Sequence, residues 1–213
     1  MTSRGLTAER GSDAYPHKFG GSSWAIRAPG QPSPALLMCL VAADPRLELD
    51  PQLGEVPLCS RLDGASLAPQ SYVFNPVTRG VAFEGERWDV ELDPMDVLPN
   101  PLPESPLRLR DLTAGEDQEQ TDRYDVQDTF LGGGSFLRVG GTPLWIFDAE
   151  DVQCTCGREC DFVAAIGYEN YDHPSGLVAP ATPFFFGEIA LYFFLCPPCA
   201  RMAVLSQATL RGE

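Results

Sequence analysis

Residues 187–199, Gly-Glu-Ile-Ala-Leu-Tyr-Phe-Phe-Leu-Cys-Pro-Pro-Cys, place an apolar and aromatic run directly before two cysteines. The wider run 177–200 is long enough to cross a bilayer, but it carries Glu188 near its middle and two prolines, Pro180 and Pro183, before that. A charge and prolines at these depths disfavour a membrane span. The stretch therefore predicts a buried β-strand that ends in a cysteine-bearing turn.

The composition extends this interpretation to the whole chain. Its 213 residues include 20 Gly and 20 Pro, scattered so that few segments are left uninterrupted for a helix. We expect a mainly β fold with few short helices. Runs rich in β-branched and aromatic residues predict strands at 35–43, 55–62, 71–74, 87–92, 136–139, 144–147, 162–166 and 188–195. Helices are predicted at 200–210 and around 116–126.

Short blocks of sequence recur in the same order in the two halves of the chain. The pairs are Phe19-Gly20-Gly21 followed by Trp24 with Val139-Gly140-Gly141 followed by Trp145, Val41-Ala42-Ala43 with Val163-Ala164-Ala165, and 53–58 with 186–191. This repeat predicts two related β-rich lobes, residues 15–83 and 130–213, that form one compact unit. Residues 1–14 are expected to be a flexible N-terminus, and the acidic, Pro-rich stretch 84–129 a connector on the surface.

Two close pairs of cysteines lie in the C-terminal half. Cys154 and Cys156 precede Gly157, and Cys196 and Cys199 flank two prolines, so two tight turns can present four thiolates to one ion. Four sulfurs at roughly 2.3 Å close a tetrahedral zinc site without leaving a position for water. The pattern predicts a structural Zn²⁺ site. Because one residue separates the first pair, where two are commoner, Cys160 is an alternative ligand in place of Cys154.

The other thiols and the histidines offer a weaker signal of catalysis. Cys39 and Cys59 lie in predicted strands and are interpreted as small core residues. His17 and His173 lie in polar, turn-like segments without a nucleophile motif nearby. The alternative to a non-catalytic protein is a hydrolase or thiol enzyme that uses Cys160 or Cys39 with a histidine as its base.

The excess of acidic over basic residues indicates which classes of macromolecule the chain can bind. With 15 Lys and Arg against 30 Asp and Glu, the net charge of −15 repels nucleic acid and attracts basic proteins. The N-terminal stretch has no apolar segment typical of a secretion signal, so we expect a cytoplasmic protein that does not enter membranes. In a reducing compartment the seven cysteines are expected to be metal ligands or core residues and not disulfides.

Several of these motifs together resemble a known family. Gly140, Gly141, Pro143 and Trp145, then the cysteine pairs at 154–156 and 196–199, are similar to the bacterial YwqG-like domain family and to the zinc-binding region of programmed cell death protein two. The resemblance covers the C-terminal half well, and this chain has Cys160 where the family tends to have methionine. It implies a β-rich lobe clamped by zinc and, from the eukaryotic relatives, binding of a basic ribosomal protein.

These signals lead to one functional prediction. We expect a non-catalytic, zinc-stabilised protein that binds another protein, which is expected to be basic. A chaperone-like adaptor and an immunity protein that neutralises a cationic toxin both fit this description.

Overall fold

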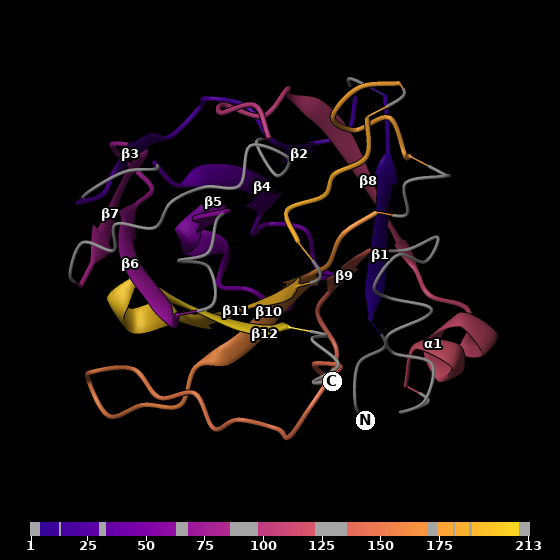
Figure 1. Cartoon of the computed structure of the whole chain (residues 1–213). Coiled ribbons are helices and arrows are strands. Elements are labelled where there is room, and N and C mark those ends of the chain that lie inside the picture. The colour runs from indigo at the N-terminus through magenta and orange to yellow at the C-terminus, as the bar shows by residue number, and fades with distance from the viewer. Residues whose placement is uncertain are drawn as a thin grey trace, which may run out of the picture.

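The computed structural model describes residues 5–12, 14–29, 33–62, 68–85, 98–121, 136–169, 174–180, 182–187 and 189–208. They form a mainly β structure, as the sequence predicts, whose strands join in one sheet that curls around a central core (Figure 1). The strands are β1 (Leu6–Arg10), β2 (His17–Phe19), β3 (Ala25–Arg27), β4 (Ala35–Val41), β5 (Glu55–Ser60), β6 (Gln70–Asn75), β7 (Gly80–Glu84), β8 (Ser105–Asp111), β9 (Leu137–Val139), β10 (Asp161–Ile166), β11 (Ile189–Cys196) and β12 (Arg201–Ala208). Their order across the sheet is β3-β7-β6-β12-β11-β10-β9-β1-β8-β2-β4-β5.

The prediction of a surface connector is wrong for residues 105–111, and that of a flexible N-terminus is wrong for residues 6–10. β8 pairs with both β1 and β2, and β1 also pairs with β9, so both strands lie inside the sheet. The reason is alternation: Leu107 and Leu109 are buried, while the arginines between and after them point outward. The predicted strand at 87–92 lies outside the described residues.

Two further predictions of secondary structure are wrong. Residues 201–208 are not helical but form β12, which hydrogen-bonds to β11 on one side and β6 on the other. Two backbone partners outweigh the helix preference of Ala, Met and Leu. Residues 144–147 form an irregular loop and not a strand. The other predicted helix is present as α1 (Ala114–Thr121), which starts at a reciprocal pair of hydrogen bonds between Thr113 and Glu116.

Side chains link β5, at one edge of the curled sheet, to β6, which lies near the other edge. The Tyr72 hydroxyl of β6 donates to the Pro57 carbonyl at 2.6 Å and accepts from the Cys59 amide at 2.9 Å. The Arg61 amide donates to the side-chain oxygen of Gln70 at 3.0 Å. These bonds satisfy backbone groups of β5, and of Arg61 just after it, on the side of β5 that faces away from β4, because buried polar groups of the chain need a partner.

The internal repeat has a structural counterpart. Gly20 and Gly140 both adopt positive φ and donate their amides to Leu37 and Val163, each of which lies at a bulge in its strand. Leu37 is therefore the structural equivalent of Val163. The alignment of the two halves that the sequence predicts, with Val41 matched to Val163, is shifted by four residues from the structural one. Strands from 15–83 lie on both sides of the C-terminal strands, so the two halves share one sheet.

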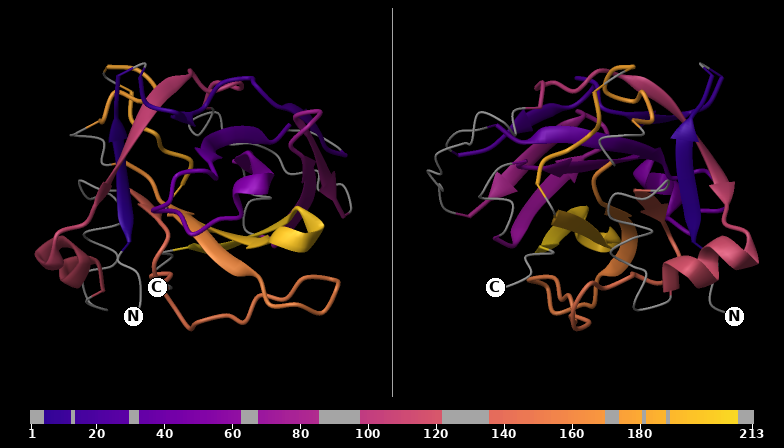
Figure 2. Two further views of the ribbon diagram at one scale, coloured as in Figure 1. Left: turned by 180° about the vertical axis from the view of Figure 1, so that it is seen from behind. Right: turned by 45° about the vertical axis from the view of Figure 1, so that its right-hand side comes forward.

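The outer face of β10–β12 carries a second, smaller core. It contains buried residues of these strands, such as Tyr192 and Phe194, and is covered by the loop 143–160, which runs along the outside of this layer (Figure 2). Trp145 packs against Tyr192 and stacks on Phe194, with ring centroids 4.7 and 5.7 Å apart. This packing positions the cysteine-bearing part of the loop beside the end of β11. Among the described residues, no helix is long and apolar enough to cross a membrane.

Candidate metal centre

Four cysteine sulfurs converge at the end of β11. The Sγ atoms of Cys154, Cys156, Cys196 and Cys199 all lie within 4.8 Å of one another, and those of Cys156 and Cys196 are 3.7 Å apart. A tetrahedral ion with metal–sulfur bonds of roughly 2.3 Å requires its sulfurs to be about 3.8 Å apart. The cluster therefore has the donor set and the spacing to hold one metal ion.

A small hairpin positions the first pair. The Cys160 amide donates to the Val152 carbonyl at 2.9 Å, and the Cys154 amide donates to the Arg158 carbonyl at 2.8 Å. The turn between them closes with a bond of 2.8 Å from the Gly157 amide to the Cys154 carbonyl, and Gly157 has a φ of 81°. Glycine adopts this conformation without strain, which explains its place after the second cysteine. We call residues 150–161 the knuckle hairpin.

A turn between two strands positions the second pair. Cys196 is the last residue of β11, and Pro197–Cys199 form a single 3₁₀ turn, η5. Ala200 then adopts a left-handed conformation with its amide bonded to the Pro197 carbonyl at 3.1 Å, which directs the chain into β12. The prolines fix φ in the turn and carry no amide donors, so they suit this tight reversal.

The sulfurs differ in their ionisation. The backbone amide of Cys156 donates to the Cys154 sulfur and lowers its pKa to about 6, against the opposing effect of burial. Burial raises the pKa of Cys196 to about 12 in the same cluster. Four thiolates at such short distances would repel one another, so all four can be deprotonated together only if a cation compensates their charge. Uptake of a metal ion would release protons and favour the thiolate form of all four.

Cys160, the alternative ligand, lies outside the cluster of four sulfurs. It is opposite Val152 in the knuckle hairpin, is buried, and has a pKa raised to about 11, first by burial. The geometry therefore brings together the set with Cys154 and not the set with Cys160.

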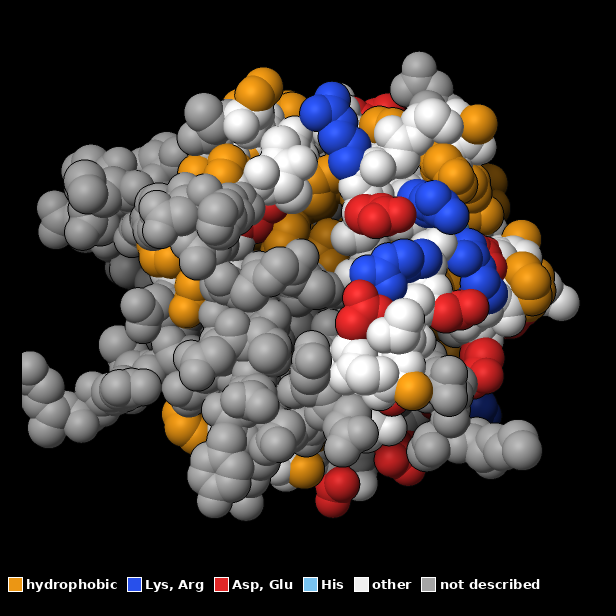
Figure 3. All heavy atoms as spheres, turned by 90° about the vertical axis from the view of Figure 1, so that its right-hand side faces the viewer, with side chains coloured by type: hydrophobic (Ala, Val, Ile, Leu, Met, Phe, Trp, Pro, Cys, Tyr) orange, Lys and Arg blue, Asp and Glu red, His pale blue; other side chains and the backbone are white. Residues whose placement is uncertain are grey.

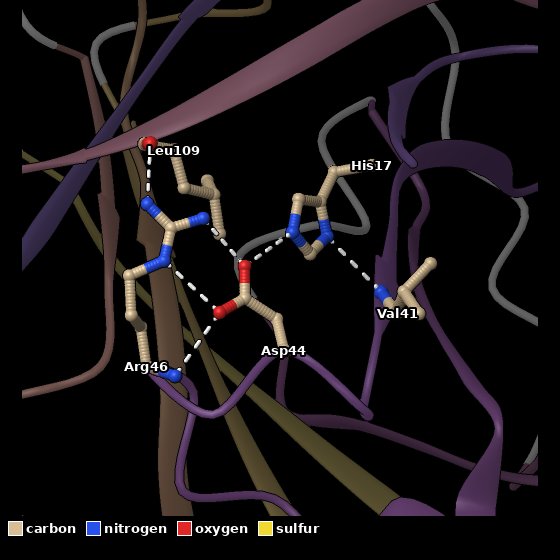
Figure 4. Close-up of polar contacts among 5 residues, drawn as sticks. All are labelled: His17, Val41, Asp44, Arg46 and Leu109. Carbon is tan, nitrogen blue, oxygen red and sulfur yellow. Dashed lines mark hydrogen bonds and ion pairs between the residues drawn. The ribbon is translucent and has the colours of Figure 1, made fainter. Parts of the chain in front are cut away.

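The thiol–histidine arrangement required for an enzyme is not formed by His17. Its Nδ1 accepts from the Val41 amide at 3.1 Å, and its Nε2 lies 3.0 Å from a carboxylate oxygen of Asp44 (Figure 4). Cys39 instead donates to Glu55 at 3.6 Å, and burial raises its pKa to about 12. Burial similarly raises the pKa of Cys59. His173 lies outside the described residues.

Sequence reasoning missed the network around His17. Arg46 binds both carboxylate oxygens of Asp44 and donates to the Leu109 carbonyl of β8 at 2.7 Å, so the loop after β4 is tied to two strands (Figure 4). These residues are distant in sequence from Leu109. The spacing of Asp44 and Arg46 was the only local signal.

The N-terminal half has an arginine where the C-terminal half has a cysteine of the candidate metal cluster. The match of Leu37 with Val163 makes Ala35 equivalent to Asp161. Ala35 pairs with Ser60 and Asp161 pairs with Leu195, so the next residues, Arg61 and Cys196, are equivalent as well. Arg61 is buried and donates to the Pro29 carbonyl at 2.6 Å, so a hydrogen bond links the end of β5 to the segment before β4.

Comparison of the chain with known protein families, with curated proteins and with solved structures found no match. The resemblance to YwqG-like domains therefore stays a prediction from the motifs.

Proposed function

We propose that this chain is a zinc-stabilised, non-catalytic protein that binds a basic protein partner. The observation that carries the proposal is the convergence of four cysteine sulfurs on one point at the end of β11. Sulfur-only, tetrahedral donor sets favour Zn²⁺, and a closed set of four leaves no position for a substrate or an activated water. In this arrangement the metal supplies a cross-link between the knuckle hairpin and the β11–β12 turn.

The state of the other reactive groups supports a non-catalytic role over a thiol enzyme. The raised pKa values of Cys39 and Cys160 keep these thiols protonated near neutral pH, whereas thiol catalysis needs the thiolate. Both ring nitrogens of His17 already have partners in the fold, so this imidazole has no free nitrogen to act as a base.

The distribution of charge supports a basic partner. On the face formed by β1, β8 and α1, blue and red side chains alternate (Figure 3), and arginines there pair with acids, as Arg110 does with Glu116 at 2.7 Å. The chain nevertheless carries twice as many acidic as basic residues. The uncompensated negative field attracts cationic surfaces and repels phosphate backbones. A chaperone-like adaptor and an immunity protein both fit this class.

Two measurements test the proposal. Elemental analysis of freshly purified full-length chain is expected to find one zinc per chain. The same chain, used as bait in an extract of its native host, is expected to retain a basic protein at low salt that dissociates at high salt, because screening weakens the attraction. The recovered partner is then purified and its direct binding measured. Zinc-free protein, or the absence of a salt-sensitive basic partner, would refute the corresponding half of the proposal.

The rival thiol enzyme has a separate test. Brief treatment of native protein with a substoichiometric alkylating reagent, followed by mass spectrometry, measures which thiol reacts first. A single hyper-reactive Cys39 or Cys160 would support the enzyme and contradict the non-catalytic function.

A further inference from the structure

A cavity of about 350 Å³ lies between the knuckle hairpin and the paired strands β6 and β12. It lies next to the metal cluster, since Cys154 forms part of its wall. Cavities of this size hold a small ligand or one long side chain of a partner. The cavity therefore needs an account beyond the structural role of the metal.

The lining combines an apolar surface with acidic groups. Val152, Ala203 and Leu205 contribute apolar side chains, and these residues also pack in the outer core of β10–β12. Glu150 and Asp151, both exposed, contribute carboxylates from the hairpin side. A surface that is apolar at one part and anionic at another matches a side chain with a hydrocarbon stem and a cationic head.

The carboxylates at this cavity have no cationic partner among the described residues. Neither Glu150 nor Asp151 makes an ion pair or hydrogen bond within that part of the chain. Arg201 also lines the cavity, but it is bound to Glu84, which in turn accepts from Ser71 at 3.2 Å. The positive charge of Arg201 is therefore compensated by Glu84 and does not neutralise Glu150 or Asp151. Residues 148–161 contain five acidic side chains and one arginine, so the local charge is negative.

We propose that this cavity receives a lysine or arginine side chain from an extended, basic segment of the partner protein. The methylene stem packs on Val152, Ala203 and Leu205, and the cationic head binds Glu150 and Asp151. The inference rests on the proposed function, because it locates the contact that a basic partner makes. It assigns the metal-held hairpin a second role, which is to form one wall of a binding site.

The probe for this site is the synthetic peptide acetyl-Gly-Gly-Arg-Gly-Gly-amide. A peptide with citrulline in place of arginine has nearly the same shape without the charge, and serves as the neutral control. Titration of each into isotopically labelled, metal-loaded full-length protein is followed by amide chemical shifts. We expect the arginine peptide to shift the signals of residues that line the cavity, among them Ser71, Gln153 and Ala203.

Charge-neutralising variants test the assigned carboxylates. The double substitution Glu150→Gln with Asp151→Asn is expected to weaken binding of the arginine peptide by about five- to thirtyfold, the upper part of the range for loss of two exposed charge pairs. The matched control, Glu9→Gln with Glu104→Gln, removes the same total charge elsewhere and is expected to leave the affinity within about twofold. Unchanged metal content and melting temperature exclude misfolding as the cause.

Each outcome separates this inference from the proposed function. Equal binding of the citrulline peptide, shifts confined to another face, or an unaffected double variant would overturn the cavity assignment and leave a basic partner standing. Selective arginine binding at the cavity, without any basic partner in the host extract, would instead refute the proposed function alone. Absence of detectable binding of the arginine peptide would also overturn the cavity assignment.

Discussion

Loss of one metal ligand should destabilise the whole fold by an amount that the chain connectivity sets. We consider Cys156→Ser, because this side chain is exposed and its replacement disturbs little packing. A metal ion held by all four sulfurs would join Cys156 to Cys196, which are 40 residues apart in sequence. A cross-link that closes a loop of this length removes unfolded-chain entropy worth about 4 kcal/mol at 25 °C. For a chain of this size, that corresponds to a fall in melting temperature of about 8–16 °C.

The assay is thermal unfolding followed by circular dichroism, with zinc content measured on the same samples. Cys160→Ala is the matched control, since it removes a neighbouring thiol that lies outside the four-sulfur cluster. It is expected to keep one zinc per chain. The reasoning would be refuted if Cys156→Ser kept both its zinc and its melting temperature, or if Cys160→Ala lost the metal while Cys154→Ala retained it.

Three other predictions follow from contacts in the sheet and in the small loop after β4. Burial lowers the pKa of His17 below 6.5, so the imidazole binds a proton more readily in the unfolded chain than in the folded chain. As the pH falls below about 6.5, the urea concentration at the unfolding midpoint of the wild type should therefore decrease. The part of this decrease that His17 causes should be absent in His17→Gln. Tyr72→Phe leaves the Cys59 amide and the Pro57 carbonyl without partners and should cost about 2–4 kcal/mol in denaturant unfolding, whereas a cost below about 0.5 kcal/mol would show that these bonds do not link the sheet ends. Cys39, with its pKa raised to about 12, should resist iodoacetamide at pH 7.5 in native protein and react after unfolding; rapid native labelling would contradict the assignment of this thiol to the core.

Part of the site could be predicted because its determinants are local. The spacing of Cys154 and Cys156 before Gly157, and of Cys196 and Cys199 around two prolines, defines two turns within a few residues each. The structure brings these four sulfurs together. The sequence could not decide between Cys154 and Cys160 as a ligand, because this depends on which face of the knuckle hairpin turns toward β11.

The sequence by itself determined the β-rich class and, within one residue, the strand at 189–196, which was predicted at 188–195. These features follow from apolar runs and from frequent Gly and Pro, all of which act over a few residues. Only the tertiary structure decided that residues 105–111 lie inside the sheet and that 201–208 form a strand. Each depends on hydrogen-bond partners far along the chain, and two flanking strands outweigh the preference of a local segment.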